Sequence, residues 1–198
     1  RIFHIRPDQF VELTALPEAL PETGFLWVGV ACSAFESLVT EVQGALQRWT
    51  GGALVDLHVS DLLNQQLPSH YDYTSWYDML VFRRLATSRG LADADDGTLA
   101  GVRRAFESID TSPVGFALVD RVLVTVHSAG CEVRDHFAHR LAGLATGAEM
   151  RGAGRLPANP ADLMLRMINH MVDSYLDLRR LLTRELGTLQ QELLDQRS

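Results

Sequence analysis

A helical pattern in the last quarter of the chain constrains the fold more than any other feature. Asn159, Pro160 and Asp162 form a typical helix start, with a capping side chain, a proline at the first helical position and a carboxylate at the positive end of the helix dipole. Apolar residues then recur in steps of three and four: Met164, Ile168, Met171, Tyr175, Leu178, Leu182, Leu186, Leu189 and Leu193. The sequence therefore predicts one long amphipathic helix.

The length of this helix bears on how the chain is organised. At about 1.5 Å of rise per residue it is roughly 55 Å long, whereas the roughly 160 residues before it pack into a globule about 40 Å across. We therefore expect an α/β/α domain at residues 1–157, followed at residues 158–198 by a long helix that extends beyond it. Since the helical pattern continues to the last residues, we also expect the chain to be a fragment of a longer protein.

Short apolar strands alternate with amphipathic helices in the first part of the chain. The predicted strands cover residues 25–30, 79–82, 114–119 and 122–126, and the predicted helices cover residues 33–50, 60–66 and 132–144. Ser33 and Glu36 form a capping box at the first helix, and the two strands that flank Asp120 and Arg121 indicate a hairpin. The predicted fold class is α/β (α+β), with a mixed, largely antiparallel sheet sandwiched between helices.

Composition excludes several classes of function. The formal net charge of −7 argues against a nucleic-acid surface, which needs a basic patch. The longest apolar run, Phe25 to Cys32, is far shorter than the about 20 residues of a membrane span, so no membrane contact is expected from this part of the protein. Cys32 and Cys131 are expected to be reduced thiols of a cytosolic protein. No nucleophile motif surrounds either cysteine, so we do not expect an enzyme.

Two histidines have the spacing of metal ligands on a helix. His136 and His139 share one helix face, with Asp135 and Cys131 nearby in the sequence. However, the pair lacks the Glu of a His-Glu-x-x-His motif, and no third and fourth ligands follow at zinc-site spacings. A solvated helix face is therefore the better interpretation of these two residues.

Four segments occur in an order that resembles a known family. They are Asp61-Leu-Leu-Asn64 before Pro68, the segments Tyr77–Phe82 and Val122–Val126, and Met167–Tyr175 in the long helix. In this order they resemble the N-terminal cytoplasmic domain of the CorA family of divalent-metal transporters, which includes the ZntB zinc transporters. The resemblance covers most of the chain. The Gly-Met-Asn pore signature and the two membrane helices, which follow the long helix in the family, are absent from residues 1–198.

The resemblance implies a homopentamer that forms a cytoplasmic funnel below the pore of a Mg²⁺/Co²⁺ transporter in the cell membrane. Divalent ions bound by carboxylates between subunits would then favour the closed state. The resemblance points to Asp61 as a metal residue, with Asp173 and Asp177 as weaker candidates. The alternative interpretations are a helix cap for Asp61 and solvated helix positions for the other two. Unlike the family pattern, this chain has Ser60 in place of a Glu and no basic residue beside its proline.

Two alternatives stay open at this point. The domain of a ZntB-like zinc transporter would give His136 and His139 a larger role. A soluble interaction module would use the long helix to form a coiled coil with a partner. The gene beyond Ser198 distinguishes these alternatives, because a transporter requires two further apolar spans of about 20 residues.

Overall fold

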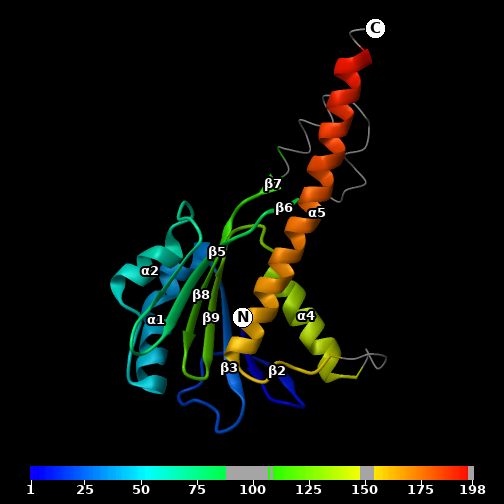
Figure 1. Ribbon diagram of the computed structural model, residues 1–198. Coiled ribbons are helices and arrows are strands. Elements are labelled where there is room, and N and C mark those ends of the chain that lie inside the picture. Colours follow the sequence, from blue (N-terminus) through cyan, green and yellow to red (C-terminus); the bar gives the residue numbers. More distant parts are fainter. Residues whose placement is uncertain (88–106, 108, 148–153, 196–198) are drawn as a thin grey trace. The chain divides into compact units, whose positions relative to one another are not determined.

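The computed structural model describes residues 1–87, 107, 109–147 and 154–195 (Figure 1). The chain divides into two compact units. The first comprises Arg1–Arg83 and Pro113–Met167, and the second comprises Arg84–Ser112 and Ile168–Ser198.

A seven-stranded mixed sheet forms the centre of the first unit. Its strands are β1 (Ile2–Ile5), β2 (Phe10–Leu13), β3 (Phe25–Ala31), β4 (His70–Tyr73), β5 (Asp78–Arg83), β8 (Pro113–Val119) and β9 (Val122–His127). They lie in the order β2-β1-β3-β9-β8-β5-β4. The central strands β3 and β9 are parallel, and all other neighbouring strands are antiparallel. The predicted mixed, largely antiparallel sheet is therefore confirmed.

The predicted hairpin around Asp120 and Arg121 is present. Val119 pairs with Val122, so the turn between β8 and β9 has only these two central residues. Asp120 has a φ of 49°, in the left-handed region that two-residue hairpins require. Aspartate adopts this region more readily than most residues, which explains how the turn forms without a glycine.

Helices α1 (Cys32–Thr50) and α2 (Asp56–Leu63) cover one face of the sheet (Figure 1). In the described part of the chain, the core between these helices and the sheet contains sixteen buried side chains, among them those of Leu26, Phe35, Leu46, Met79 and Val124. Helix α2 approaches the sheet closely because residue 115 is a glycine. A Cβ atom at Gly115 would lie 2.5 Å from Cδ2 of Leu62.

Helix α4 (Val133–Ala145) lies on the opposite face of the sheet (Figure 1). It buries Val133, Phe137, Ala138 and Leu141. Strand residues that alternate with those of the α1 face, such as Trp27 and Leu123, are fully buried and pair with each other across β3 and β9. The sheet is therefore buried on both faces, which explains the continuous apolar character of its central strands.

The second unit combines a short hairpin with most of α5 (Pro160–Asp195). Strands β6 (Ala86–Thr87) and β7 (Ile109–Asp110) pair antiparallel. Leu178 and Leu181 of α5 form a small buried cluster, against which Leu85, Ile109 and Leu182 pack. The Ser174 hydroxyl adds a hydrogen bond to the Leu85 carbonyl at 2.8 Å.

Helix α5 begins where the sequence predicts. The Asp162 N–H donates to Oδ1 of Asn159 at 2.8 Å, so Asn159 is the capping residue. The Asp162 carboxylate in turn accepts the Ala158 N–H at 2.9 Å and pairs with Arg166 one turn later. This reciprocal arrangement satisfies two backbone donors at the helix start.

The predicted apolar face of α5 is only partly correct. Met171 and Leu178 are buried as expected. In contrast, Leu186 and Leu193 are 59% and 63% exposed. The buried leucine and methionine residues of α5 are Leu163, Met167, Met171, Leu178 and Leu181. The buried stripe is therefore displaced around the helix from the predicted one.

The predicted starts of α1 and α2 are wrong. Strand β3 leads directly into α1, which begins at Cys32 with Ala31 as its capping residue and no side-chain cap, so Ser33 lies inside the first turn. Helix α2 begins at Asp56 instead of Ser60. In both cases tertiary structure determines the boundary, and the local capping pattern is not used.

Candidate functional site

The predicted metal residue Asp61 lies on α2 and faces a histidine of the edge strand β4. Its Oδ2 is 3.6 Å from Nε2 of His70, and the two side chains are 19% and 31% exposed respectively. This separation allows both atoms to bind one ion at distances of about 2.0–2.2 Å. Asp61 is not at the start of α2, so the helix-cap interpretation does not apply.

A buried hydrogen-bond chain holds α2 against β4 and β5. His58 of α2 is 3% exposed. Its Nδ1 lies 2.7 Å from the Tyr77 hydroxyl, and its Nε2 lies 3.0 Å from Oδ2 of Asp72. The same hydroxyl accepts the Val55 N–H at 2.9 Å. Since the hydroxyl can then donate its proton to Nδ1, this network assigns the His58 proton to Nε2, which donates to Asp72.

The pKa shifts of Asp72 and Tyr77 agree with a His58 proton on Nε2. The hydrogen bond from His58 lowers the pKa of Asp72, and the Tyr73 N–H lowers it further. Burial raises the pKa of Tyr77. At neutral pH, Asp72 is therefore a carboxylate that accepts a hydrogen bond from His58, and Tyr77 is a neutral phenol that donates one to it. The hydrogen bonds of His58 fix α2 to the sheet edge, and they thereby fix the position of Asp61 relative to His70.

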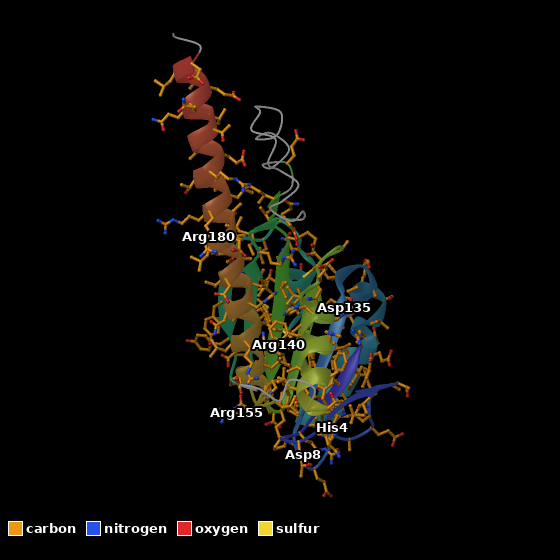
Figure 2. All side chains as sticks on the ribbon, turned by 90° about the vertical axis from the view of Figure 1, so that its right-hand side faces the viewer. His4, Asp8, Asp135, Arg140, Arg155 and Arg180 are labelled. Atoms are coloured by element: carbon orange, nitrogen blue, oxygen red, sulfur yellow. The ribbon has the colours of Figure 1, made fainter. Side chains whose placement is uncertain are left out.

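The two other predicted carboxylates lie on α5, in the second unit. Asp173 is exposed. Asp177 is also exposed, and its Oδ1 is 3.4 Å from Nη1 of Arg180, one turn later on the same helix. Figure 2 labels Arg180, whose side chain projects away from the helix. An exposed ion pair of this kind contributes little to stability, so both residues occupy solvated positions in this chain.

The two histidines considered as possible zinc ligands, His136 and His139, are both exposed on α4. The His136 ring packs edge-on against Phe137, with 5.4 Å between ring centroids. Because α4 and α2 cover opposite faces of the sheet, these histidines and Asp61 cannot share one ion within a subunit.

Within the described ranges, no group of three or more His, Cys, Asp and Glu side chains is arranged to hold a metal ion. Asp61 and His70 therefore form at most half of a complete ligand set, since zinc usually takes four ligands and harder ions take more. Among the helices that the structure describes, none is long and apolar enough to cross a membrane.

Sequence inspection missed His58 and His70. His70 belongs to the site because β4 and β5 pair in one register, with His70 opposite Val81 and Asp72 opposite Met79. His58 comes from α2 and joins the site through Asp72. The alternation His70-Tyr71-Asp72 was the available signal. In a strand, alternate residues point to the same face, so a histidine and an aspartate two residues apart both face α2.

No protein-family model and no curated protein matches this sequence. Solved structures do match its fold. The chain superimposes on the complete CorA magnesium transporter from Methanocaldococcus jannaschii with a TM-score of 0.65 and 14% identity, covering 98% of this chain and 51% of that one. The separate soluble domain of the same protein gives a TM-score of 0.60 at 14% identity, with 98% and 65% covered.

A zinc-transporter domain has a similar fold. The ZntB cytoplasmic domain from Vibrio parahaemolyticus matches with a TM-score of 0.52 and 13% identity, covering 89% of this chain and 60% of that one. The chain thus spans about half of the complete transporter and less than two thirds of the two soluble domains. Identities this low establish a shared fold. The chain has the fold of the soluble domains of CorA and ZntB, the family that its sequence resembles.

Proposed function

We propose that this chain is the cytoplasmic metal-sensing domain of a CorA-like divalent-cation transporter of the cell membrane, and not an enzyme. The observation that carries the proposal is the fold match to the M. jannaschii transporter over 98% of the chain. In the complete protein, five copies would form a funnel below the pore. Long helices such as α5 would lead from each sensing domain toward the membrane.

Asp61 is the proposed contribution of this chain to a regulatory ion site between subunits. The carboxylate is partly buried, and its position is fixed by α2. A bound ion would draw Asp61 and a carboxylate of a neighbouring subunit together. Asp173 and Asp177 are the candidates for that second carboxylate. Loss of the ion would leave like charges facing each other and favour separation of the subunits.

Mg²⁺ or Co²⁺ is the ion that the CorA likeness favours. Mg²⁺ prefers oxygen ligands and keeps several waters, so a few carboxylates suffice to bind it. The imidazole of His70 beside Asp61 favours a second candidate, a ZntB-like zinc domain, because zinc and cobalt accept nitrogen as well as oxygen. The zinc alternative would assign the selective role to His70 more readily than to His136 and His139, which are exposed on α4.

Thermal unfolding with each ion tests the proposal. Mg²⁺, Co²⁺ and Zn²⁺ would be titrated into the wild type, Asp61→Asn, His70→Gln and the control Glu36→Gln, which removes an exposed carboxylate of α1. Ion at 100 times its dissociation constant stabilises the folded state by about 2.7 kcal/mol, which corresponds to a rise in Tm of about 5–10 °C for a chain of this size. Sedimentation velocity on the same samples would report the oligomeric state.

The outcomes separate the candidates. A rise in Tm that Asp61→Asn abolishes and Glu36→Gln preserves supports Asp61 as the metal residue. If His70→Gln abolishes the response to Zn²⁺ and leaves that to Mg²⁺, the zinc interpretation gains support. A sample that sediments as an oligomer yet responds to none of the three ions would contradict the sensing proposal. An ion-independent dimer held by α5 would instead support a coiled-coil interaction module.

A further inference from the structure

The sheet ends at strand β4 with an exposed aromatic surface on the face opposite α2. The residues of β4 that face α2 alternate with Tyr71 and Tyr73, so these two tyrosines face the other side. Their rings stack with 6.0 Å between ring centroids, yet the two residues are 60% and 69% exposed. A stacked aromatic pair is therefore open to solvent at this edge of the sheet.

Strand pairing extends this surface inward from the edge. Leu80 of β5 lies opposite Tyr71, and Asp78 of β5 lies opposite Tyr73. Leu118 of β8 lies on the other side of Asp78. Asp78, Leu80 and Leu118 are each half-buried, whereas the β5 residues on either side of Leu80, which face α2, are buried. We call Tyr71, Tyr73, Asp78, Leu80 and Leu118 the β4 patch. Adjoining exposed apolar side chains of this kind are typical of a contact site.

The charge on and beside the β4 patch is negative. The Asp78 carboxylate accepts a hydrogen bond from the Tyr71 hydroxyl at 2.5 Å. Asp120 follows Leu118 by two residues and is exposed in the turn between β8 and β9. Two β4 patches that faced each other would bring their carboxylates together, which disfavours pairing of the β4 edges of two copies. The patch instead fits an apolar surface that carries positive charge.

Helix α5 has such a surface on its outer side. Leu165, Val172 and Leu176 are all exposed. Because successive helical residues are about 100° apart, these three lie on the side of α5 opposite its buried leucines and methionines. Arg179 is also exposed and continues the same side, seven residues after Val172 and three after Leu176. We call these four residues the outer stripe. Two parallel outer stripes in contact would bring Arg179 of each copy together, which disfavours that pairing.

We propose that the β4 patch binds the outer stripe of α5 from a second copy of this chain. The apolar side chains of the two surfaces meet, and Arg179 of one copy lies against Asp78 and Asp120 of the other, so the charges are complementary. The spacings also agree. Four helical residues, the separation of Val172 and Leu176, rise about 6 Å, and alternate residues of a strand are about 7 Å apart.

The contact is head-to-tail, because each copy contributes a different surface on each side. A contact of this type closes into a ring when the rotation between copies allows it. The inference rests on the assembly in the proposed function and identifies the surfaces through which neighbouring copies meet. It also places the neighbour at β4, the strand that carries His70 of the candidate site.

Sedimentation velocity of the 198-residue chain tests this contact. We expect the wild type to associate as its concentration rises between roughly 1 µM and 1 mM. Tyr73→Ser in the patch and Leu176→Ser in the stripe should each weaken this association at least about tenfold. The controls Leu57→Ser and Leu193→Ser, which change comparably exposed leucines outside both surfaces, should leave it within about twofold. A wild type that stays monomeric throughout, with and without ions, would overturn the proposal.

A mixture of the two variants tests the head-to-tail arrangement. Tyr73→Ser keeps an intact stripe and Leu176→Ser keeps an intact patch, so an equimolar mixture should form a one-to-one dimer although neither variant associates alone. The dimer should have the affinity of the wild-type contact within about threefold. If α5 pairs with α5 instead, Tyr73→Ser alone would associate like the wild type and the mixture would give no mixed dimer. Either of these results would refute the contact.

A charge exchange tests the proposed ion pair. Arg179→Glu and Asp78→Arg should each weaken association about tenfold, and the two changes together in one chain should restore it to within about threefold of the wild type. Losses that merely add in the double variant would contradict the pairing of these two residues. Circular dichroism checks that each variant is folded.

The same samples separate this inference from the sensing proposal. Each measurement is made in EDTA and then with Mg²⁺, Co²⁺ and Zn²⁺ in turn, with Asp61→Asn alongside. A mixed dimer that forms while no ion binds would support the contact and contradict metal sensing. Ion binding that depends on Asp61, together with a mixture that never associates, would refute the contact and leave metal sensing intact.

Discussion

The buried hydroxyl of Tyr77 offers the sharpest test of how the candidate site is built. Tyr77→Phe removes one oxygen and leaves Nδ1 of His58 and the Val55 N–H without the partner that each has in the wild type. An unsatisfied buried polar group costs about 1–3 kcal/mol. His58 is almost fully buried, whereas the Val55 N–H is only partly buried. We therefore expect a total loss of about 2–3 kcal/mol, or a fall in Tm of about 5–10 °C.

Tyr71→Phe is the matched control for this substitution. The Tyr71 hydroxyl also donates a hydrogen bond, to Oδ1 of Asp78 at 2.5 Å, but the Tyr71 side chain is exposed. Its removal should change stability by no more than about 0.5 kcal/mol. Urea unfolding followed by circular dichroism measures both variants. Equal effects of Tyr71→Phe and Tyr77→Phe would refute the argument that a buried network fixes α2.

Three further predictions concern single contacts. Asn159→Ala removes the α5 cap and should cost about 1 kcal/mol in urea unfolding, whereas an unchanged midpoint would mean that the cap contributes nothing. Gly115→Ala should cost about 1–3 kcal/mol, because the new Cβ forces Leu62 to move; a gain in stability would show that Leu62 adapts freely. The pKa of Asp72 is lowered in the folded chain by His58, so its stabilising effect is present above its ordinary pKa of about 3.9 and is lost as the pH falls below that value. The wild type should therefore lose stability more steeply than Asp72→Asn between about pH 4 and 3, and parallel curves would contradict this linkage.

The features of this fold that depend only on interactions between residues close in sequence are predictable from the sequence. Asn159 marks the start of α5 because its cap involves residues only three positions apart. The β8–β9 hairpin is evident from two apolar runs separated by Asp120 and Arg121. By contrast, the start of α2 depends on a contact between Val55 and Tyr77, which are 22 residues apart in sequence. No local pattern around Ser60 reports that contact.

The buried face of α5 shows a second limit of periodicity. Apolar residues line two neighbouring stripes, one through Leu163 and Met167 and another through Met164 and Ile168. Steps of three and four are consistent with either stripe. The predicted stripe also continued to Leu193, which is exposed. Burial depends on the elements that pack against the helix, and the sequence of the helix alone does not specify them.

Only one residue of the candidate site was predictable from the sequence. The family resemblance pointed to Asp61, but its neighbour His70 comes from the edge strand of the sheet, where the register of β4 on β5 determines which side chains face α2. The chemistry of the site therefore depends on side chains that tertiary structure brings together.

Calorimetric titration of the wild-type chain and Asp61→Asn with Mg²⁺, Co²⁺ and Zn²⁺ tests the central claim most directly. The metal-sensing proposal predicts saturable binding of at least one ion by the wild type, loss of that binding in Asp61→Asn, and retention of it in the control Glu36→Gln at matched oligomeric state. Binding that is equally strong in Asp61→Asn and in the wild type would contradict Asp61 as the metal residue. Absence of binding to an assembled wild-type chain would contradict the sensing function itself.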